Sequence, residues 1–275
     1  MLNDPFIRLA AFLVTFACIA GWEALRPHRP QVFGRPRRWP HNLGILLVDV
    51  LMLRLLAPGA AIAVALTAQQ GGWGLLNALV LPQWLCVPLA VVLLDLAIYF
   101  QHVVFHAVPT LWRLHRVHHA DLEFDVTTGT RFHPIEILLS TGIKCAAVAA
   151  IGAPPLAVLV FEILLNATAL FNHANVSLPA RADRWLRWLV VTPDMHRIHH
   201  SVRHAESSSN FGFNLPWWDR IFATYRAHAK AGGDITVGVD AFRSGDDLRL
   251  DRLLVQPFLN TPGLYPINRR EAPVQ

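Results

Sequence analysis

Residues 95–119 read DLAIYFQHVVFHAVPTLWRLHRVHH, an apolar run that passes into a histidine-rich segment. This stretch contains the first two of three histidine clusters: His102-x-x-x-His106, His115-x-x-His118-His119 and His196-x-x-His199-His200. Residues three or four positions apart share one face of a helix, so each cluster aims two or three imidazoles in one direction. Because imidazole binds iron, zinc and copper, these spacings are typical of metal ligands.

The eight clustered histidines are difficult to explain as ordinary structural residues. Independent structural roles for all of them would leave many ring nitrogens without partners in a largely apolar protein. Ordinary core or surface roles are expected instead for His28, His41, His204 and His228. His133 and His173 also stand alone, but each lies where an apolar run meets a polar segment. We therefore predict the clusters as ligands and treat His173 and His133 as further candidates.

The composition points to a membrane protein. Of the 275 residues, 53% are hydrophobic and 16% are charged, whereas soluble domains carry roughly 25% charged residues. A mean hydropathy of +0.36 leaves too little polar surface to cover a water-soluble globule. The net charge of +5 comes without a basic tract or an RNA-binding aromatic motif, which argues against nucleic-acid binding. The three cysteines lie far apart, so they predict neither a disulfide framework nor a cysteine-based zinc motif.

Five apolar runs are long enough to cross a bilayer, which takes about 20 residues in a helix. They cover Phe6 to Leu25, Leu43 to Leu66, Trp84 to Phe105, Ile135 to Ile151 and Ala153 to Phe171. We expect four to five helical spans, of which the first is a retained anchor rather than a signal peptide.

The arginines indicate the orientation of these spans. Five arginines lie between the first two runs, whereas residues 67–83 carry no charge. By the positive-inside rule the arginine loop is cytoplasmic and the uncharged loop is external. Following the spans from there places all three histidine clusters on the cytoplasmic side. The predicted fold is an all-α membrane protein with four to five transmembrane helices and a cytoplasmic, histidine-rich helical cap that binds metal.

Two polar residues accompany the first cluster inside the membrane. Asp95 and Tyr99 lie seven and three residues before His102, on the same helical face. Polar groups are costly to bury in a bilayer and are usually functional there. We predict that both orient ligand imidazoles through hydrogen bonds. Hydrogen bonding between helices is the alternative.

Further motifs join the clusters between Val91 and Tyr225. They are Asp95-x-x-x-Tyr99-x-x-His102, Trp112-x-x-His115, Arg131-x-His133-Pro134, Asn172-His173, Asn210-Phe211-Gly212 and the segment from Trp218 to Tyr225. With the histidine clusters, this series resembles the membrane fatty acid hydroxylase and sterol desaturase superfamily. Ala223 stands where the closing signature usually has glycine.

The resemblance implies a non-haem oxygenase with two iron ions that hydroxylates or desaturates a lipid with O2 at the cytoplasmic face. Zinc could replace iron in the purified protein, because imidazole also binds it. Asn210 is expected to form hydrogen bonds near the metals, with a turn-forming role as the alternative. Electrons are expected from a separate redox protein, since no fused redox domain is evident.

The implied organisation has three regions: a transmembrane anchor region at 1–83, the hydroxylase-like catalytic domain at 84–228 and a cytoplasmic tail at 229–275. Two other classes of function remain open. One is a membrane zinc hydrolase acting on lipids with Glu123 or Glu136 as base, although the chain lacks a His-Glu-x-x-His motif. The other is a non-enzymatic metal- or haem-binding membrane protein. The motifs do not determine which lipid is the substrate.

Overall fold

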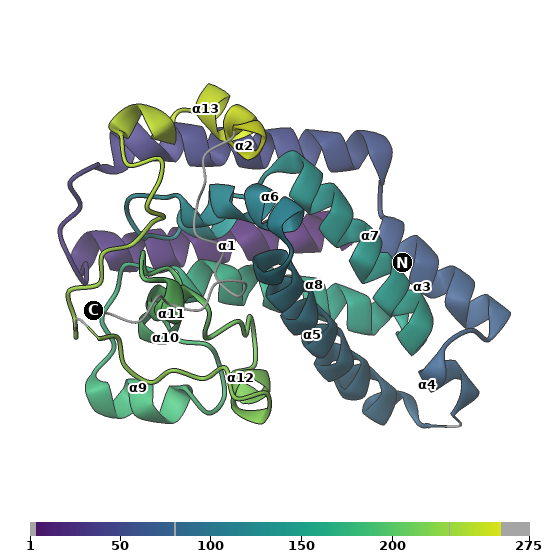
Figure 1. Ribbon diagram of the computed structural model, residues 1–275. Coiled ribbons are helices and arrows are strands. Elements are labelled where there is room, and N and C mark those ends of the chain that lie inside the picture. Colours follow the sequence, from purple (N-terminus) through teal and green to yellow (C-terminus); the bar gives the residue numbers. More distant parts are fainter. Residues whose placement is uncertain (1–3, 80, 231, 260–275) are drawn as a thin grey trace.

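The computed structural model describes residues 4–79, 81–230 and 232–259, and its regular elements are all helices (Figure 1). Within these residues, β-structure is limited to two isolated bridges, Pro27 with Val176 and Ser201 with Val237. The prediction of an all-α protein is confirmed.

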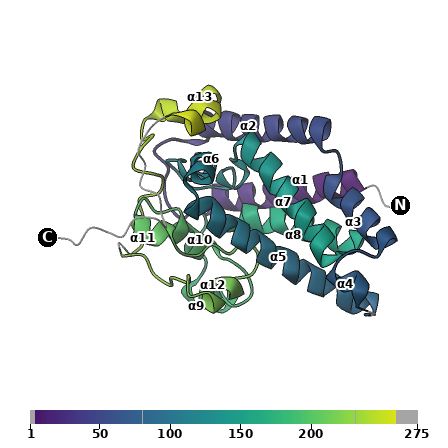
Figure 2. The same ribbon diagram turned by 45° about the vertical axis from the view of Figure 1, so that its right-hand side comes forward.

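The long helices form a bundle, and most of the short ones gather at one end of it (Figures 1 and 2). The long helices are α1 (Asp4–Leu25), α2 (Arg35–Leu56), α3 (Ala60–Gly71), α5 (Gln83–Ala107), α7 (Pro134–Ile151) and α8 (Pro155–Asn172). The short ones are α4 (Leu75–Ala78), α6 (Pro109–His119), α9 (Ala180–Leu186), α10 (Pro193–His199), α11 (His204–Ser207), α12 (Trp217–Ile221) and α13 (Leu250–Val255). Three 3-10 turns complete the set: η1 (Thr128–Thr130), η2 (Gly245–Leu248) and η3 (Gln256–Phe258).

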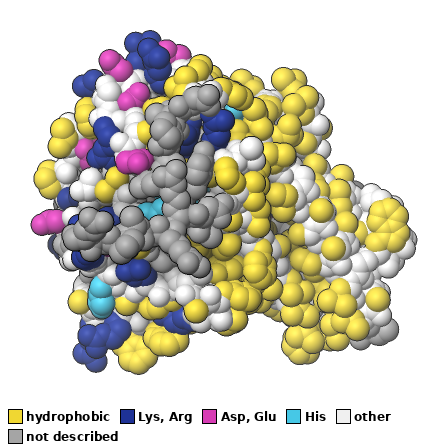
Figure 3. Space-filling model, viewed as in Figure 1, with side chains coloured by type: hydrophobic (Ala, Val, Ile, Leu, Met, Phe, Trp, Pro, Cys, Tyr) yellow, Lys and Arg dark blue, Asp and Glu magenta, His cyan; other side chains and the backbone are white. Residues whose placement is uncertain are grey.

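Five helical segments are long and apolar enough to cross a membrane. They are Pro5–Leu25, Arg35–Ala78, Gln83–Ala107, Pro134–Ile151 and Pro155–Asn172. This confirms the prediction of four to five spans, and the protein is a multi-pass membrane protein. Hydrophobic side chains cover the right-hand part of the surface in Figure 3, whereas charged side chains gather on the left.

The second apolar run differs from its prediction. The sequence predicts one run from Leu43 to Leu66, but the structure divides it between α2 and α3. Pro58 excludes the helical conformation for the residue before it, and Ala57 accordingly has φ −145°. Gly59 then takes a left-handed conformation with φ 63°. At its N-terminal end α2 begins at Arg35, eight residues before the predicted run, so its first turns belong to the polar cap.

The core of the bundle lies between α3, α5, α7 and α8, where Ala65, Leu94 and Phe161 are buried. At its far end, the loop after α3 meets the turn between α7 and α8. A Cβ atom on Gly74 would lie 2.2 Å from the backbone nitrogen of Gly152, so this contact requires glycine. The uncharged loop that the sequence predicts to be external therefore lies beside the turn between α7 and α8, at one end of the bundle.

A sharp turn between α5 and α6 folds the first two histidine clusters onto each other. Val108 is the single residue between the helices, and its backbone is extended with φ −91° and ψ 119°. Pro109 causes this, because a proline disfavours helical conformation in the preceding residue. Pro109 itself occupies the first position of α6, where its missing N–H group is not needed.

The described part of the predicted tail, residues 232–259, packs against the cap. Helix α13 lies on α2 (Figures 1 and 2), and Leu253 is buried against Ile45 and Val117. Ile235 and Val237 join a second small core. This segment therefore covers the histidine-rich region, and residues 260–275 of the predicted tail lie outside the described residues.

Candidate metal centre

Nine buried histidines, which lie on α5, α6 and α10 or directly after α8 and α10, converge in two groups. The first group is His102, His106, His115, His119 and His199, and the second is His118, His173, His196 and His200. In each group the possible ligand atoms all lie within 4.8 Å of one another. The groups adjoin, because the rings of His119 and His200 stack with centroids 4.4 Å apart. The structure thus brings together nine of the ten histidines predicted as ligands.

In the first group, two nitrogen lone pairs face each other. The Nδ1 atoms of His102 and His199 lie 2.7 Å from the carbonyl oxygens of Phe211 and Ser209. Since a carbonyl only accepts, each Nδ1 carries the hydrogen, and each Nε2 of the neutral ring carries a lone pair. These two Nε2 atoms lie 3.1 Å apart. Lone pairs at this distance repel each other unless a cation lies between them.

The number of close contacts at His173 indicates a cation in the second group as well. His173 donates from Nδ1 to the Ala169 carbonyl at 2.7 Å, so its Nε2 carries a lone pair. The Nε2 atoms of His118, His196 and His200 all lie 3.1 Å from it. One lone pair cannot accept three hydrogen bonds. A cation bound by all four nitrogens accounts for the arrangement.

The spacing also fits a metal ion. Metal–imidazole bonds of about 2.1 Å would place two nitrogens about 3.0 Å apart at right angles and about 3.4 Å apart at the tetrahedral angle. The 3.1 Å distances in both groups lie between these two separations. A buried set of neutral nitrogen ligands suits iron, zinc or copper, so the residues present fit a metal in each group.

Backbone carbonyls hold the imidazoles, and the sequence did not reveal them. Ser209 and Phe211, whose carbonyls accept from His199 and His102, flank Asn210, which has a left-handed conformation with φ 56°. The Asn210 amide donates to the carbonyls of Met195 and Arg226, each at 2.9 Å. Asn210 therefore forms the turn between the two carbonyls, and its side chain does not bond to a histidine. This is the turn-forming role, and the side chain also bonds close to the histidines, because Met195 directly precedes His196.

Glu136 fixes a third ligand of the first group. Its Oε1 lies 2.6 Å from Nδ1 of His115, which leaves the Nε2 of His115 directed at that of His102, 3.1 Å away. Glu136 lies in the first turn of the apolar helix α7 and is 4% exposed. A carboxylate bonded to a ligand imidazole fixes its tautomer and raises its basicity. A buried acid in an apolar run was the sequence signal for this role.

Burial keeps the ligand imidazoles neutral. It lowers the pKa of His173 from 6.5 to about 4 and that of His115 to about 3. The pKa values of His118, His196, His199 and His200 are lowered in the same direction, with neighbouring imidazoles adding to the effect. Neutral rings are the form that coordinates metals.

Asp95 and Tyr99 do not contact the histidines, contrary to the prediction. Asp95 accepts hydrogen bonds from the backbone of Asn214 and Leu215 and from the Trp218 indole at 2.8 Å. The Tyr99 hydroxyl pairs with Thr224 at 2.9 Å. Both residues instead attach α5 to the segment that follows Phe211. They support the carbonyl that orients His102 rather than the imidazole itself.

His133 lies outside both groups. Its Nδ1 accepts from the backbone of Ile135 and caps α7, and its Nε2 lies 3.2 Å from the Leu254 carbonyl. Both ring nitrogens are therefore engaged away from the metal centre. His28, His41, His204 and His228 also belong to neither group.

A buried ionic network supports the loop after α6, and sequence reasoning missed it. Arg38 of α2 pairs with Asp121 and Asp125, with closest contacts of 2.6 Å to each. All three side chains are almost fully buried. Although burial opposes this, Arg38 lowers the pKa values of both carboxyl groups. The network fixes the segment that leaves His119 and keeps α2 against the cap.

An apolar cavity of about 350 Å³ reaches the first group from within the bundle. It lies between α1, α2, α5, α7 and α8, and both His102 and His115 line it. Phe12, Leu53 and Phe105 contribute to its apolar wall. Its size is in the range of small-molecule sites, and its position leads from the apolar bundle to the imidazoles.

Comparison with known proteins supports one family. The family model described as fatty acid hydroxylase matches residues 87–224, which include all nine converging histidines. No solved structure matches the chain significantly.

Three relatives illustrate the similarity. The ornithine lipid hydroxylase of Rhizobium tropici is 28% identical over 226 residues, which cover 78% of this chain and 65% of the relative. The alkylglycerol monooxygenase of Xenopus tropicalis is 27% identical over 136 residues, covering 48% and 28% of the two chains. The cholesterol 25-hydroxylase of Homo sapiens is 26% identical over 141 residues, covering 49% and 48%. The chain thus spans about two thirds of the first relative and half or less of the others.

Proposed function

Since the chain belongs to the fatty acid hydroxylase family, we propose that it is a membrane-bound non-haem di-iron oxygenase that hydroxylates or desaturates a lipid. The observation that carries this proposal is the opposed pair of lone pairs on His102 and His199, 3.1 Å apart inside a group of five imidazoles. The second group of four imidazoles adjoins it, so the chain offers one site for each of two ions.

The proposed ligands are the nine converging histidines, His102, His106, His115, His118, His119, His173, His196, His199 and His200. His133 is not among them, because its ring nitrogens are engaged elsewhere. Iron bound in these groups would supply the activation of dioxygen. Zinc would compete with iron during purification, since it accepts the same ligands.

Other residues of the chain orient the ligand imidazoles and form the path for the substrate. The carbonyls of Ser209 and Phe211 hold two imidazoles in one tautomer, and Glu136 holds a third. The cavity gives the substrate a water-poor path to the His102 and His115 side of the first group. A lipid fits this path, because the cavity lies among helices that span the membrane. The names of the relatives, which are hydroxylases or monooxygenases of lipids, support the same class of substrate.

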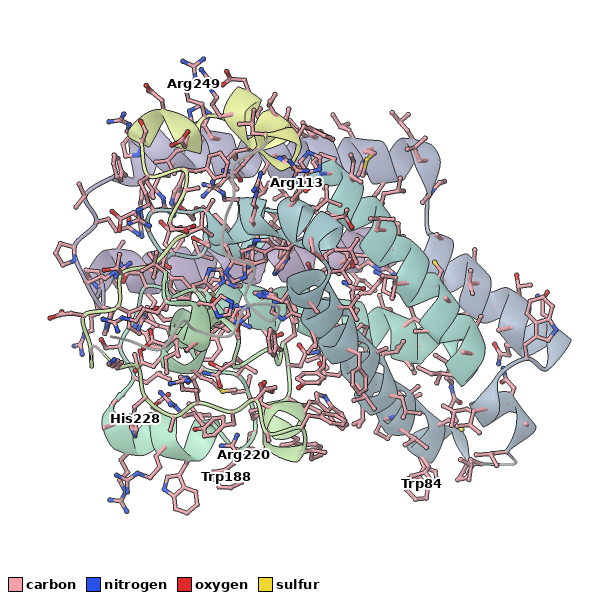
Figure 4. All side chains as sticks on the ribbon, in the orientation of Figure 1. Trp84, Arg113, Trp188, Arg220, His228 and Arg249 are labelled. Carbon is pink, nitrogen blue, oxygen red and sulfur yellow. The ribbon has the colours of Figure 1, made fainter. Side chains whose placement is uncertain are left out.

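We place the histidine cap on the cytoplasmic side. The arginines between the first two apolar runs contact the cap, because Arg29 donates to the carbonyl of Ile235 and Arg38 pairs with Asp121. Exposed tryptophans occur on both sides of the bundle: Figure 4 shows Trp84 at the far end of α5 and Trp188 near α9. Tryptophan is enriched at membrane interfaces, so the two residues suit the two faces of the bilayer. A separate redox protein on the cytoplasmic side would supply electrons.

The proposed regions are the anchor region 1–83, the catalytic domain 84–228 and the tail 229–275. The first and last contribute to the cap through Arg38 and Leu253. A truncated catalytic domain would therefore lack Arg38, which pairs with both Asp121 and Asp125.

Oxygen uptake by the full-length, iron-loaded protein in nanodiscs tests the proposal. Ornithine lipid, an alkylglycerol and cholesterol would be offered in turn with a chemical reductant and labelled dioxygen. We expect uptake that depends on one of these lipids and is absent in His199→Ala. Label in the product indicates hydroxylation, and loss of two hydrogens indicates desaturation. Ester hydrolysis without uptake would support the zinc hydrolase instead, and no turnover of any lipid would favour a metal- or haem-binding protein.

A further inference from the structure

The cavity contains three buried oxygen atoms that have no hydrogen-bond partner. They are Oδ1 of Asp49 on α2, Oε1 of Gln101 on α5 and Oε2 of Glu136 on α7. All three residues line the same cavity, and Asp49 and Glu136 are each only 4% exposed. Three helices thus contribute unpaired polar atoms to one cavity, most of whose other lining side chains are apolar.

Each of the three groups can accept a hydrogen bond, because the Gln101 oxygen is an amide carbonyl and a carboxyl group keeps an acceptor oxygen in either protonation state. The Gln101 amide nitrogen is already used, since it donates to Ser140 at 2.9 Å. Glu136 uses its other oxygen for His115. Among the residues that the structure places along this cavity there is no lysine or arginine. Leaving a buried acceptor without a donor is energetically costly. The cavity is therefore suited to a ligand that brings N–H or O–H groups to these oxygens.

Asp49 has no other role in the site. It lies seven residues after Asn42 on the buried face of α2, about 10 Å deeper along the helix at 1.5 Å per residue. Leu46 and Leu53 lie one turn to either side of it and line the same cavity. Asp49 also lies outside residues 87–224, which the family model matches. Its carboxyl group belongs to the part of the cavity wall that α2 contributes.

We propose that Asp49, with Gln101, accepts hydrogen bonds from an N–H or O–H group of the lipid that occupies this cavity. The substrate class is then an amino- or hydroxyl-bearing lipid rather than an unsubstituted hydrocarbon chain. This rests on the proposed function in that the ligand of the cavity is taken to be the substrate. The polar group binds at Asp49 while another part of the molecule extends toward His102 and His115.

Binding of three simple probes tests the proposal. Dodecylamine, dodecanol and dodecane share one chain length and differ in the donor group. Each would be titrated into the full-length protein in phosphatidylcholine nanodiscs, and the concentration dependence of the thermal midpoint gives its affinity. We expect the amine or the alcohol to bind about 10- to 100-fold more tightly than dodecane, because dodecane leaves the buried acceptors without a partner. Equal binding of all three probes would overturn the proposal.

Two substitutions at Asp49 identify the acceptor. Asp49→Leu should abolish the preference for donor-bearing probes, and a preference that persists in this variant contradicts the role of Asp49. Asp49→Asn keeps the shape and a neutral acceptor, so it should retain a preference for the alcohol but lose one for the amine. The exposed Asp251→Asn is the matched control and should bind all probes like the wild type.

This measurement needs neither dioxygen nor a reductant. A probe preference in a protein that never consumes oxygen would support the Asp49 site and reject the oxygenase. Oxygen consumption without a probe preference would support the oxygenase and reject the Asp49 site.

Discussion

His102 and His199 direct their Nε2 atoms at each other across 3.1 Å, although 97 positions separate them in the chain. The opposite ring nitrogen, Nδ1, donates a hydrogen bond to a backbone carbonyl in each case: that of Phe211 for His102 and that of Ser209 for His199. The two carbonyls lie on either side of Asn210. One short turn therefore orients ligands from two distant clusters, which makes the first metal site depend on the geometry of residues 209–211.

The division between converging and isolated histidines predicts unequal effects of substitution. His199→Ala should abolish oxygenation and lower the metal content, because it removes an imidazole whose Nε2 faces that of His102. His204→Ala should leave the metal content unchanged, since His204 belongs to neither group. Metal analysis of both variants, normalised to membrane-inserted protein, checks this. Equal loss of metal in the two variants would contradict the assignment.

The turn at Asn210 predicts a metal defect without loss of any ligand. Asn210→Val should lower iron affinity by about 10- to 100-fold, the usual effect of losing the groups that orient ligands, because a β-branched residue disfavours φ 56°. Asn210→Gly should be affected less, since glycine accepts this conformation. Anaerobic Fe(II) titration of both variants measures the difference. Equal affinities in the valine variant and the wild type would show that the turn does not orient the ligands.

Glu136 predicts a graded series. Glu136→Leu removes the acceptor of the His115 Nδ1–H group and should weaken iron binding by about 10- to 100-fold. Glu136→Gln keeps an acceptor oxygen and should recover most of the affinity. The same Fe(II) titration, with membrane insertion as the control, compares the variants. If the glutamine variant were as weak as the leucine variant, the negative charge rather than the hydrogen bond would be responsible.

The Arg38 network predicts an unusual dependence of stability on pH. Arg38→Met leaves Asp125 buried without a cation and Asp121 with Arg131 alone, at 3.6 Å, which should cost about 3–5 kcal/mol near neutral pH. In the wild type the pKa of Asp125 lies below its usual 3.8, so this stabilisation is present above that range and is lost as the pH falls through the lowered pKa. Without Arg38, burial raises the carboxyl pKa, so acidification should partly restore the stability of the variant.

Thermal midpoints in detergent between neutral and acidic pH, with Arg249→Met as the exposed control, test this. The gap between Arg38→Met and the wild type should narrow in acid. A gap that stays constant with pH would mean that Arg38 stabilises the cap through packing alone.

The sequence predicted what depends on local spacing and composition. Helical spacing identified the three clusters, and the apolar runs identified the spans, because both patterns repeat within a few turns of one helix. Hydrophobicity did not reveal the break between α2 and α3 at Pro58 and Gly59. The residues on both sides of this break are apolar, so they form one continuous apolar run in the sequence. The partners of Asp95 and Tyr99 were also out of reach, because they lie more than a hundred residues further along the chain.

The sequence also could not predict the hydrogen-bond partners of the imidazoles. Backbone carbonyls such as those of Ser209 and Phe211 leave no signal in residue type, since every residue has one. His133 was misplaced for a related reason. A histidine that caps a helix and one that binds metal at the end of a span occupy the same kind of sequence position.

The most direct test of the account is the number of iron ions that the full-length protein binds. Anaerobic titration of the metal-free protein with Fe(II), followed by metal analysis after removal of free ion, should give two ions per chain. His199→Ala, from the first group, and His196→Ala, from the second, should each reduce the count toward one. A count of one at saturation in the wild type, or an undiminished count of two in both variants, would contradict the assignment of one ion to each histidine group.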